Sequence, residues 1–145
     1  MTPPARRVLA VYAHPDDADV SCGGTLARWA AEGAVVEVVV CAAGDKGSVD
    51  PAADRASLAE RRAGEVRAAA SVLGVAASHL LGIADGELAN DAGLRERLVA
   101  HVRRTRPEIL VCPDPTAVFF GASYVNHRDH RVAGWATLDV AAHEA

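Results

Sequence analysis

The sequence has little of what marks membrane-spanning, secreted or disordered proteins. Aromatic residues make up only 4% of its 145 residues, and no apolar run approaches the roughly 18 residues that a membrane-spanning helix needs. The apolar run that follows Arg6 and Arg7 is too short for the centre of a secretory signal peptide, so we expect none. Half of the residues are apolar, which excludes an intrinsically disordered chain and predicts a core of Ala, Val and Leu.

Cysteine and positive charge are also scarce. The three cysteines, Cys22, Cys41 and Cys112, lie far apart and form no CxxC pair, so we expect neither a disulfide framework nor a thiolate metal site. Unpaired cysteines are typical of a reducing compartment, and we expect a cytoplasmic protein. The net charge of −4 and the pI near 5.8 give no electrostatic footprint for nucleic acid or for an anionic membrane surface. The expected partner is therefore a small molecule.

Short apolar runs alternate with longer helical stretches along the chain. The runs predict strands over 8–13, 35–41, 79–83 and 109–112, and the longer stretches predict helices over 25–32, 57–73, 94–105 and 127–143. Ser57 and Glu60 form a capping-box pattern at the start of the second helix, and 113–126 is expected to be a loop. This alternation predicts a single α/β domain over residues 1–145, built on a parallel sheet whose ligands bind beyond the carboxyl ends of the strands.

Two clusters of ionisable residues stand where such a ligand would bind. They are His14-Pro15-Asp16-Asp17, directly after the first strand, and Asn126-His127-Arg128-Asp129-His130, after the fourth strand. Taken singly, the first cluster could be a turn whose aspartates cap the next helix, and the second could be a solvated helix face. The two clusters would meet if the first and fourth strands are neighbours in the sheet.

Together the clusters hold the residue types of a catalytic zinc site. Two imidazoles and one carboxylate with an open coordination position form such a set, for which we choose His14, Asp17 and His130. A general base must then accept a proton from the attacking water, and a cationic group must stabilise the oxyanion. We expect Asp16 to be the base and His127 the stabilising group. Asp129 is expected to hold His127 in its protonated form through a hydrogen bond.

Several motifs resemble those of one enzyme family over nearly the whole chain. They are AHPDD after an apolar strand, CGGTLARWA, RAGE with AAASVLGV, LGIADGEL, CPDP and the later HRDH. In these the chain resembles the PIG-L/LmbE family of zinc-dependent N-acetylglucosaminyl deacetylases. The resemblance implies a Rossmann-like three-layer sandwich with a mostly parallel sheet. It also implies metal-assisted removal of the acetyl group from an N-acetylglucosamine-containing small molecule or conjugate, with zinc or another divalent ion such as Fe²⁺.

The resemblance implies the same metal ligands and catalytic residues as the reasoning above, and it adds two residues that would contact the sugar. These are Arg62 and Asp85. Each has a plainer interpretation, since Arg62 could form a surface ion pair with Glu65 three residues on, and Asp85 with Gly86 is a turn signal. The family usually has Glu after its HPDD motif, where this chain has Ala18.

The chain is also shorter than members of this family usually are, so we expect it to lack their C-terminal part. An open sheet edge or apolar face would then predict an oligomer or a partner that covers it.

Two other functions compete with deacetylation. One is a truncated, non-catalytic module that binds a sugar or a partner chain. The other is a nucleotide-binding domain, against which the lack of a GxGxxG fingerprint argues.

Overall fold

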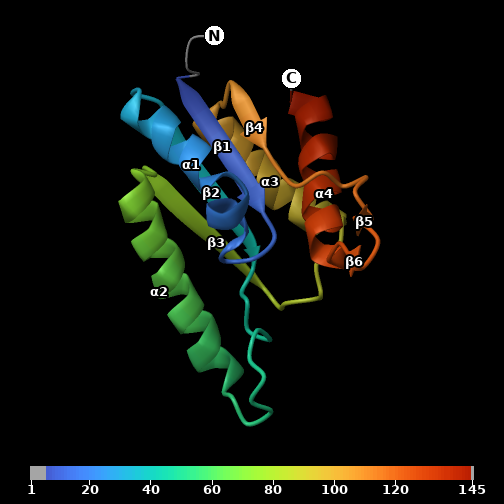
Figure 1. The fold of residues 1–145 in the computed structure, drawn as a ribbon. Coiled ribbons are helices and arrows are strands. Elements are labelled where there is room, and N and C mark those ends of the chain that lie inside the picture. The colour runs from blue at the N-terminus through green and yellow to red at the C-terminus, as the bar shows by residue number, and fades with distance from the viewer. Residues whose placement is uncertain (1–5, 145) are drawn as a thin grey trace.

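The computed structural model describes residues 6–144, which form a parallel sheet between two pairs of helices (Figure 1). The elements in chain order are β1 (Arg7–Tyr12), α1 (Asp17–Ala31), β2 (Val35–Ala42), α2 (Arg55–Leu73), β3 (Ala77–Ile83), α3 (Ala92–Thr105), β4 (Ile109–Val111), β5 (Phe119–Phe120), β6 (Tyr124–Val125) and α4 (Arg128–Glu144). The predicted α/β class is confirmed. Within the described residues no helix has both the length and the apolar character needed to cross a bilayer.

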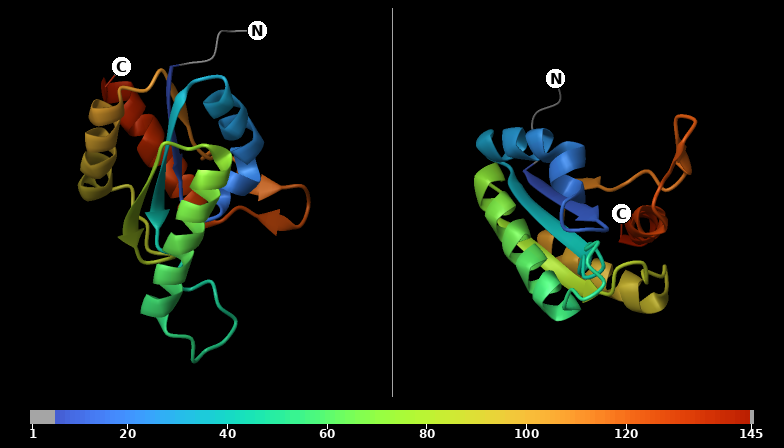
Figure 2. Two further views of the ribbon diagram at one scale, coloured as in Figure 1. Left: turned by 90° about the vertical axis from the view of Figure 1, so that its left-hand side faces the viewer. Right: turned by 60° about the horizontal axis from the view of Figure 1, so that its bottom comes forward.

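The order of the strands brings the two ionisable clusters together. The four-stranded sheet has the order β3-β2-β1-β4, and β1 pairs in parallel with both β2 and β4. Helices α1 and α2 cover one face of the sheet and α3 and α4 the other (Figure 2). Strand order therefore reverses at β1, and the crevice beyond the carboxyl ends of β1 and β4 is where such sheets bind ligands. The predicted adjacency of the first and fourth strands is confirmed.

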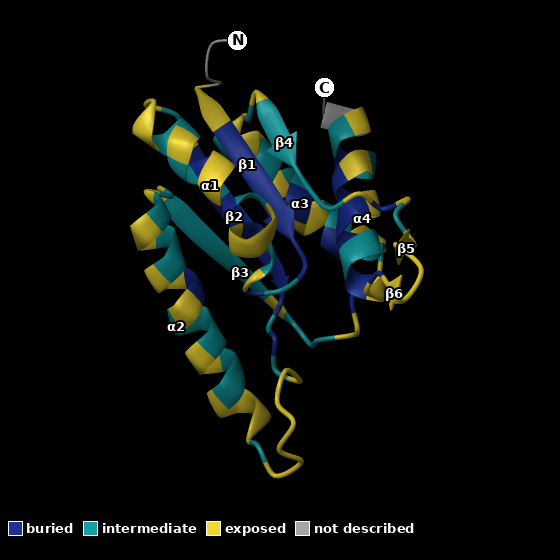
Figure 3. Ribbon diagram, in the orientation of Figure 1, coloured by how far each residue is buried: buried dark blue, intermediate teal, exposed yellow. Residues whose placement is uncertain are grey.

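Strand β1 is buried on both faces, because the sheet has a hydrophobic core on each side. All its residues after Arg7 are at most 5% exposed (Figure 3). Its side chains alternate between the two cores, as the two-residue period of a strand requires. Leu26 of α1 and Val66 of α2 pack on one side, and Leu98 of α3 and Val140 of α4 pack on the other. This rigid central strand carries the first ionisable cluster at its end.

All four helices begin at other residues than predicted, and the starts of α1 and α2 show why. Helix α1 begins at Asp17 rather than at residue 25, so Gly23 and Gly24 lie inside it. Helix α2 begins at Arg55, where Asp54 rather than Ser57 is the cap, because the Asp54 carboxylate accepts the Ser57 N–H at 2.8 Å. The start of α2 was misplaced because Asp54 and Ser57 can each cap a helix.

The segment expected to be a loop, 113–126, contains a small antiparallel hairpin. Strands β5 and β6 pair Phe119 with Val125 and Phe120 with Tyr124 across a turn at Gly121, whose φ of 63° suits glycine. All four paired side chains are more than half exposed. The hairpin projects from the carboxyl-terminal edge of the sheet beside α4 (Figure 2). β4 is an edge strand of only three residues, and its pairing with a further chain stays a prediction.

Candidate active site

The site forms where the turn after β1 meets the start of α4. The turn presents His14, and Asp17 begins α1, while His127 immediately precedes α4 and His130 lies in its first turn. Gly134, one turn further, lets α4 approach the loop after β4, because a Cβ there would clash with the Pro113 carbonyl oxygen. The two clusters, more than 100 residues apart in sequence, are therefore held in contact by the packing of β1, β4 and α4.

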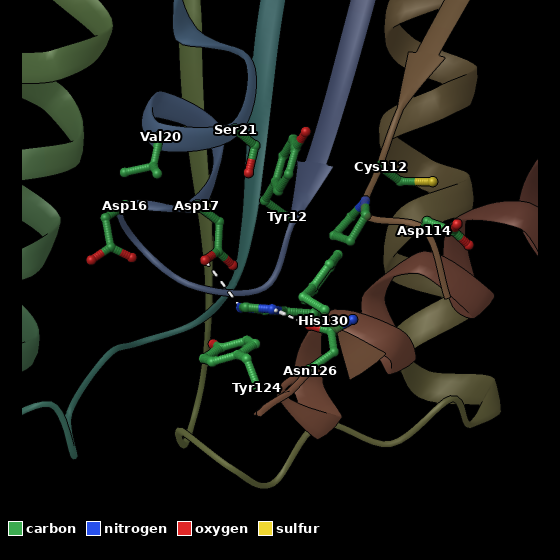
Figure 4. A pocket seen from close by; sticks show the side chains of 12 residues that line it. Tyr12, Asp16, Asp17, Val20, Ser21, Cys112, Asp114, Tyr124, Asn126 and His130 are labelled. Carbon is green, nitrogen blue, oxygen red and sulfur yellow. Dashed lines mark hydrogen bonds and ion pairs between the residues drawn. The ribbon is translucent and has the colours of Figure 1, made fainter. Parts of the chain in front are cut away.

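His14, Asp17 and His130 form a compact group of ligand atoms. His14 Nδ1 lies 3.1 Å from His130 Nε2, and the Asp17 carboxylate contacts both rings. Its Oδ2 lies 3.3 Å from His14 Nδ1, and its Oδ1 lies 3.1 Å from His130 Nε2 (Figure 4). One atom from each residue lies within 4.8 Å of the others. Two imidazole nitrogens that face each other so closely need a proton on one of them or a cation shared between them. The donor set thus fits a divalent ion such as zinc.

The charges around His14 favour a cation at this point. Burial alone would lower the pKa of His14, but the nearby carboxylates of Asp17, Asp85 and Asp129 outweigh burial and raise the pKa to about 9. Burial would raise the pKa of Asp17, but hydrogen bonds from His130 and His14 hold it well below its usual range. A proton fills this role in the metal-free protein, and a metal ion would compete with that proton.

Two carboxylates lie behind the His14 ring. The His14 Nε2 atom is buried without a well-aligned hydrogen bond, 3.1 Å from Asp85 Oδ1 and 3.5 Å from Asp129 Oδ2. Asp129 is completely buried and accepts the Gly86 N–H at 2.7 Å. Carboxylates in this position commonly keep the proton of a metal-binding histidine on its outer nitrogen, which leaves the inner nitrogen free to bind. Here they would leave Nδ1 free, the atom that faces Asp17 and His130.

Asn126 orients the second imidazole, and sequence analysis assigned it no role. Its side-chain oxygen lies 2.9 Å from His130 Nδ1, and its amide donates to the Ala117 carbonyl at 2.7 Å. Since the Asn126 oxygen only accepts, it keeps the proton of His130 on Nδ1 and leaves Nε2 free toward His14. Asn126 is 3% exposed, although Asn is mostly a surface residue. Its position four residues before His130 was the available signal.

The prediction that the Asp129 carboxylate forms a hydrogen bond with His127 is wrong. Their contact is instead a backbone one, in which the Asp129 N–H donates to His127 Nδ1 at 3.1 Å. An Nδ1 that accepts carries no proton, so Nε2 is the nitrogen of the His127 ring that can donate one. The Asp129 carboxylate faces His14 and the Gly86 N–H, as described above.

A second group of potential ligands shares His14. It consists of His14, Asp85 and His127, whose ligand atoms also lie within 4.8 Å of one another. His127 is exposed, whereas every member of the group with Asp17 and His130 is partly buried. Partial burial and the hydrogen-bonded ring of His130 favour the first group as the place for a metal ion.

Asp16 lies at the edge of the site and is held by Arg62. The Arg62 guanidinium donates to Asp16 Oδ2 at 2.8 Å and to Glu65 Oε2 at 2.5 Å. The plainer interpretation of Arg62, an ion pair with Glu65, is therefore seen, and the same side chain also reaches the predicted base. Because the Asp16 side chain is 60% exposed, its carboxylate is accessible to a small molecule.

Two cavities flank the cluster, and Asp16 lines both. The first, of about 650 Å³, reaches Asp17 and His130. Its wall includes the apolar and aromatic side chains of Tyr12, Val20, Phe120 and Tyr124. It also includes the polar side chains of Ser21, Asp114 and Asn126 (Figure 4). The second, of about 490 Å³, reaches the other side of the cluster and is lined by His14, Asp85, His127, Arg61 and Arg62. All the residues expected at the site thus lie at one edge of the sheet, with Asp129 buried beneath them.

The sequence matches one protein family over most of the described residues. The model of the PIG-L family, described as GlcNAc-PI de-N-acetylase, matches residues 9–141. The chain is 40% identical to a 1D-myo-inositol 2-acetamido-2-deoxy-alpha-D-glucopyranoside deacetylase of Streptomyces avermitilis, over 90% of this chain and 52% of that protein. It spans about half the length of the curated relatives it matches.

Solved structures share the fold. N,N'-diacetylchitobiose deacetylase from Pyrococcus horikoshii superposes with a TM-score of 0.87 at 30% identity, over 97% of this chain and 52% of that one. GalB, the 4-carboxy-2-hydroxymuconate hydratase from Pseudomonas putida, superposes with a TM-score of 0.80 at 25% identity, over 93% of this chain and 55% of that one. The fold alone therefore does not decide the chemistry. On the extent of the family match and on sequence identity, the chain belongs to the PIG-L family.

Proposed function

We propose that this chain is a metal-dependent deacetylase that removes the acetyl group from an N-acetylglucosamine-containing small molecule or conjugate. The observation that carries the proposal is the group of His14, Asp17 and His130, with the accessible carboxylate of Asp16 beside it. The sequence identity to relatives named as deacetylases supports it. In this proposal residues 1–145 act as one catalytic domain.

His14, Asp17 and His130 would hold the divalent ion, zinc or Fe²⁺. When bound, such an ion supplies a Lewis acid that polarises a carbonyl oxygen and makes water more acidic. The chain supports this binding with acceptors that face the outer nitrogens of both imidazoles. The carboxylates of Asp85 and Asp129 lie 3.1 and 3.5 Å from His14 Nε2, and the side-chain oxygen of Asn126 lies 2.9 Å from His130 Nδ1.

Asp16 is proposed as the general base. Arg62 binds one of its oxygens, Oδ2, which leaves Oδ1 free to accept a proton as water attacks the acetamide carbon. The C–N bond of the acetamide then breaks. The products are acetate and a free amine, and the proton that Asp16 accepted balances the leaving nitrogen. Arg62 is therefore proposed to position the base in addition to contacting the sugar.

His127 is proposed to stabilise the negative charge that develops on the carbonyl oxygen. Its ring borders the second cavity, and its Nδ1 is already occupied by the Asp129 N–H, so the Nε2–H is the group available to donate. We propose that the sugar lies in this cavity, where Arg62 and Asp85 can meet its hydroxyl groups. These hydroxyl groups would otherwise lose their hydrogen bonds to water on binding.

The likeness to GalB makes a second chemistry worth testing, because a hydratase also activates water but breaks no amide bond. The rival without turnover is a module that only binds a sugar or a partner chain. Release of acetate separates the proposed function from both. The hydratase would add water to an unsaturated acid, and the binding module would release nothing.

The test is to remove metal with a chelator, reload the chain with Zn²⁺ or Fe²⁺, and measure acetate release from simple N-acetylglucosaminides. We expect activity only after reloading. We expect Asp16→Asn to lower kcat by about 10²–10⁴-fold while the metal content stays unchanged. The matched control is Glu60→Gln on the exposed surface of α2, which should keep full activity. A reloaded chain that binds the sugar but releases no acetate would contradict the proposal.

A further inference from the structure

The two cavities that flank the ligand group differ in chemistry. Charged side chains line the second cavity, with Arg61, Arg62 and Glu65 on one wall and Asp85 on another. The first cavity is lined by Tyr12 at the end of β1, by Val20, and by Phe120 and Tyr124 of the β5–β6 hairpin. Polar side chains, those of Ser21, Asp114 and Asn126, line the rest of it beside the ligand group. A polar part of a substrate would therefore fit the second cavity, and an apolar part of the same substrate would fit the first; Asp16 lines both.

The apolar walls of the first cavity are exposed to water. Val20 is 85% exposed, Phe120 54% and Tyr124 55%, although these side chains would be more stable when covered. Single exposed apolar residues are common, but apolar residues gathered around a cavity mark a place where something binds. Val20 comes from α1 and the two aromatics from the hairpin, so two separate elements build this surface.

The position of Asp16 links the first cavity to the proposed reaction. Asp16 lines both cavities, whereas His130 lines the first and His14 and His127 line the second, so an acetamide held beside Asp16 is within reach of both cavities. The hydroxyl-bearing ring needs hydrogen-bond partners, which the second cavity offers. The substituent on that ring would then lie along Val20, Phe120 and Tyr124.

We propose that the first cavity binds an apolar aglycone, so that the substrate of this chain is a glucosaminide carrying an alkyl or aryl group rather than a second polar ring. This inference rests on the proposed deacetylase function. Apolar contacts with a part of the substrate remote from the acetamide add binding energy that raises kcat/KM.

The test compares the methyl and hexyl glycosides of N-acetylglucosamine, both below the concentration at which the hexyl glycoside forms micelles. Burying only two methylene groups is worth a factor of about ten. We therefore expect kcat/KM of the metal-loaded chain to be at least about tenfold higher for the hexyl glycoside. Phe120→Ala should remove most of this preference, because it should lower kcat/KM for the hexyl glycoside far more than kcat/KM for the methyl glycoside. Trp135→Ala is the matched control, since Trp135 is a half-exposed aromatic that lines neither cavity.

Calorimetric binding of the same two glycosides keeps the inference testable without turnover. Tighter binding of the hexyl glycoside, weakened by Phe120→Ala and by Val20→Ser but not by Trp135→Ala, would support it. Equal affinities or equal kcat/KM values for the two glycosides would overturn it while leaving the deacetylase proposal intact. A hexyl preference that neither Phe120→Ala nor Val20→Ser reduces would overturn it as well. If no acetate is released from either glycoside, the proposed function fails, and the binding data alone decide what the first cavity holds.

Discussion

Removal of the metal ion should leave the stability of this chain dependent on the protonation of one histidine. In the metal-free protein the carboxylates of Asp17, Asp85 and Asp129 outweigh the effect of burial and raise the pKa of His14 to about 9. In the unfolded chain the pKa of a histidine is about 6.5. Because the folded state binds the proton more tightly, the stabilisation is fully present below pH 6.5 and is lost as the pH rises to about 9.

The size of the effect follows from the difference between these pKa values. One pKa unit corresponds to about 1.4 kcal/mol, so the free energy of unfolding should fall by about 3 kcal/mol between pH 6.5 and pH 9. The His14 side chain is only 14% exposed, so solvent screens these interactions little. A change of this size is a large part of the roughly 5–15 kcal/mol that stabilises a typical domain.

The assay is urea unfolding of chelator-treated protein at several pH values between 6.5 and 9, compared with the His14→Asn variant. The comparison is needed because the cysteines also titrate in the unfolded chain near pH 8.5. Their contribution is shared by both proteins and cancels in the difference. The difference in unfolding free energy between the two proteins should shrink as the pH rises. A difference that is constant or grows would refute the electrostatic description of the site.

Three further predictions concern single side chains. Asp129→Asn should weaken zinc binding about 10–100-fold, because it alters the buried carboxylate behind His14. Zinc affinity is measured by competition with a chelator, and an unchanged affinity would show that Asp129 does not support metal binding by His14. His127→Ala should lower acetate release about 10²–10³-fold through loss of an oxyanion donor, and turnover within a few-fold of wild type would show that His127 does not stabilise the intermediate. Asp54→Ala should lower the temperature of thermal unfolding because it removes the cap of α2. Ser57→Ala should lower it less, and the reverse order would support the cap predicted from sequence.

The sheet could be predicted from sequence because its signals are strong and redundant. The nearly continuous run VVEVVVC predicts a strand buried on both faces, and β2 is such a strand over Val35–Ala42. The second helix ends at residue 73 as predicted, where Gly74 caps it in the left-handed conformation with φ 71°. The start of a helix was predicted wrongly where two nearby residues can each cap it, as Asp54 and Ser57 can. Only the packed structure selects one of them.

The metal-ligand part of the candidate site could be predicted from residue types and their spacing. His14 and Asp17, with His130, carry chemistry in their residue types and spacing, and the parallel sheet gave a reason for them to meet. The contacts behind them depend on how loops pack after the strands have paired. Neither the position of Asp85 against His14 nor that of Asn126 against His130 can be read from local sequence. The hairpin was missed because strands of two residues leave no periodic pattern.

The most direct test of this account is to titrate zinc into the metal-free chain and into variants of the two potential ligand groups. The account predicts that the wild-type chain binds one zinc ion and that His14→Ala and His130→Ala both abolish tight binding. It predicts that His127→Ala, which belongs to the other group, binds zinc as the wild type does. Tight binding that survives His130→Ala but is lost in His127→Ala would place the ion with Asp85 and His127, and would contradict the central claim.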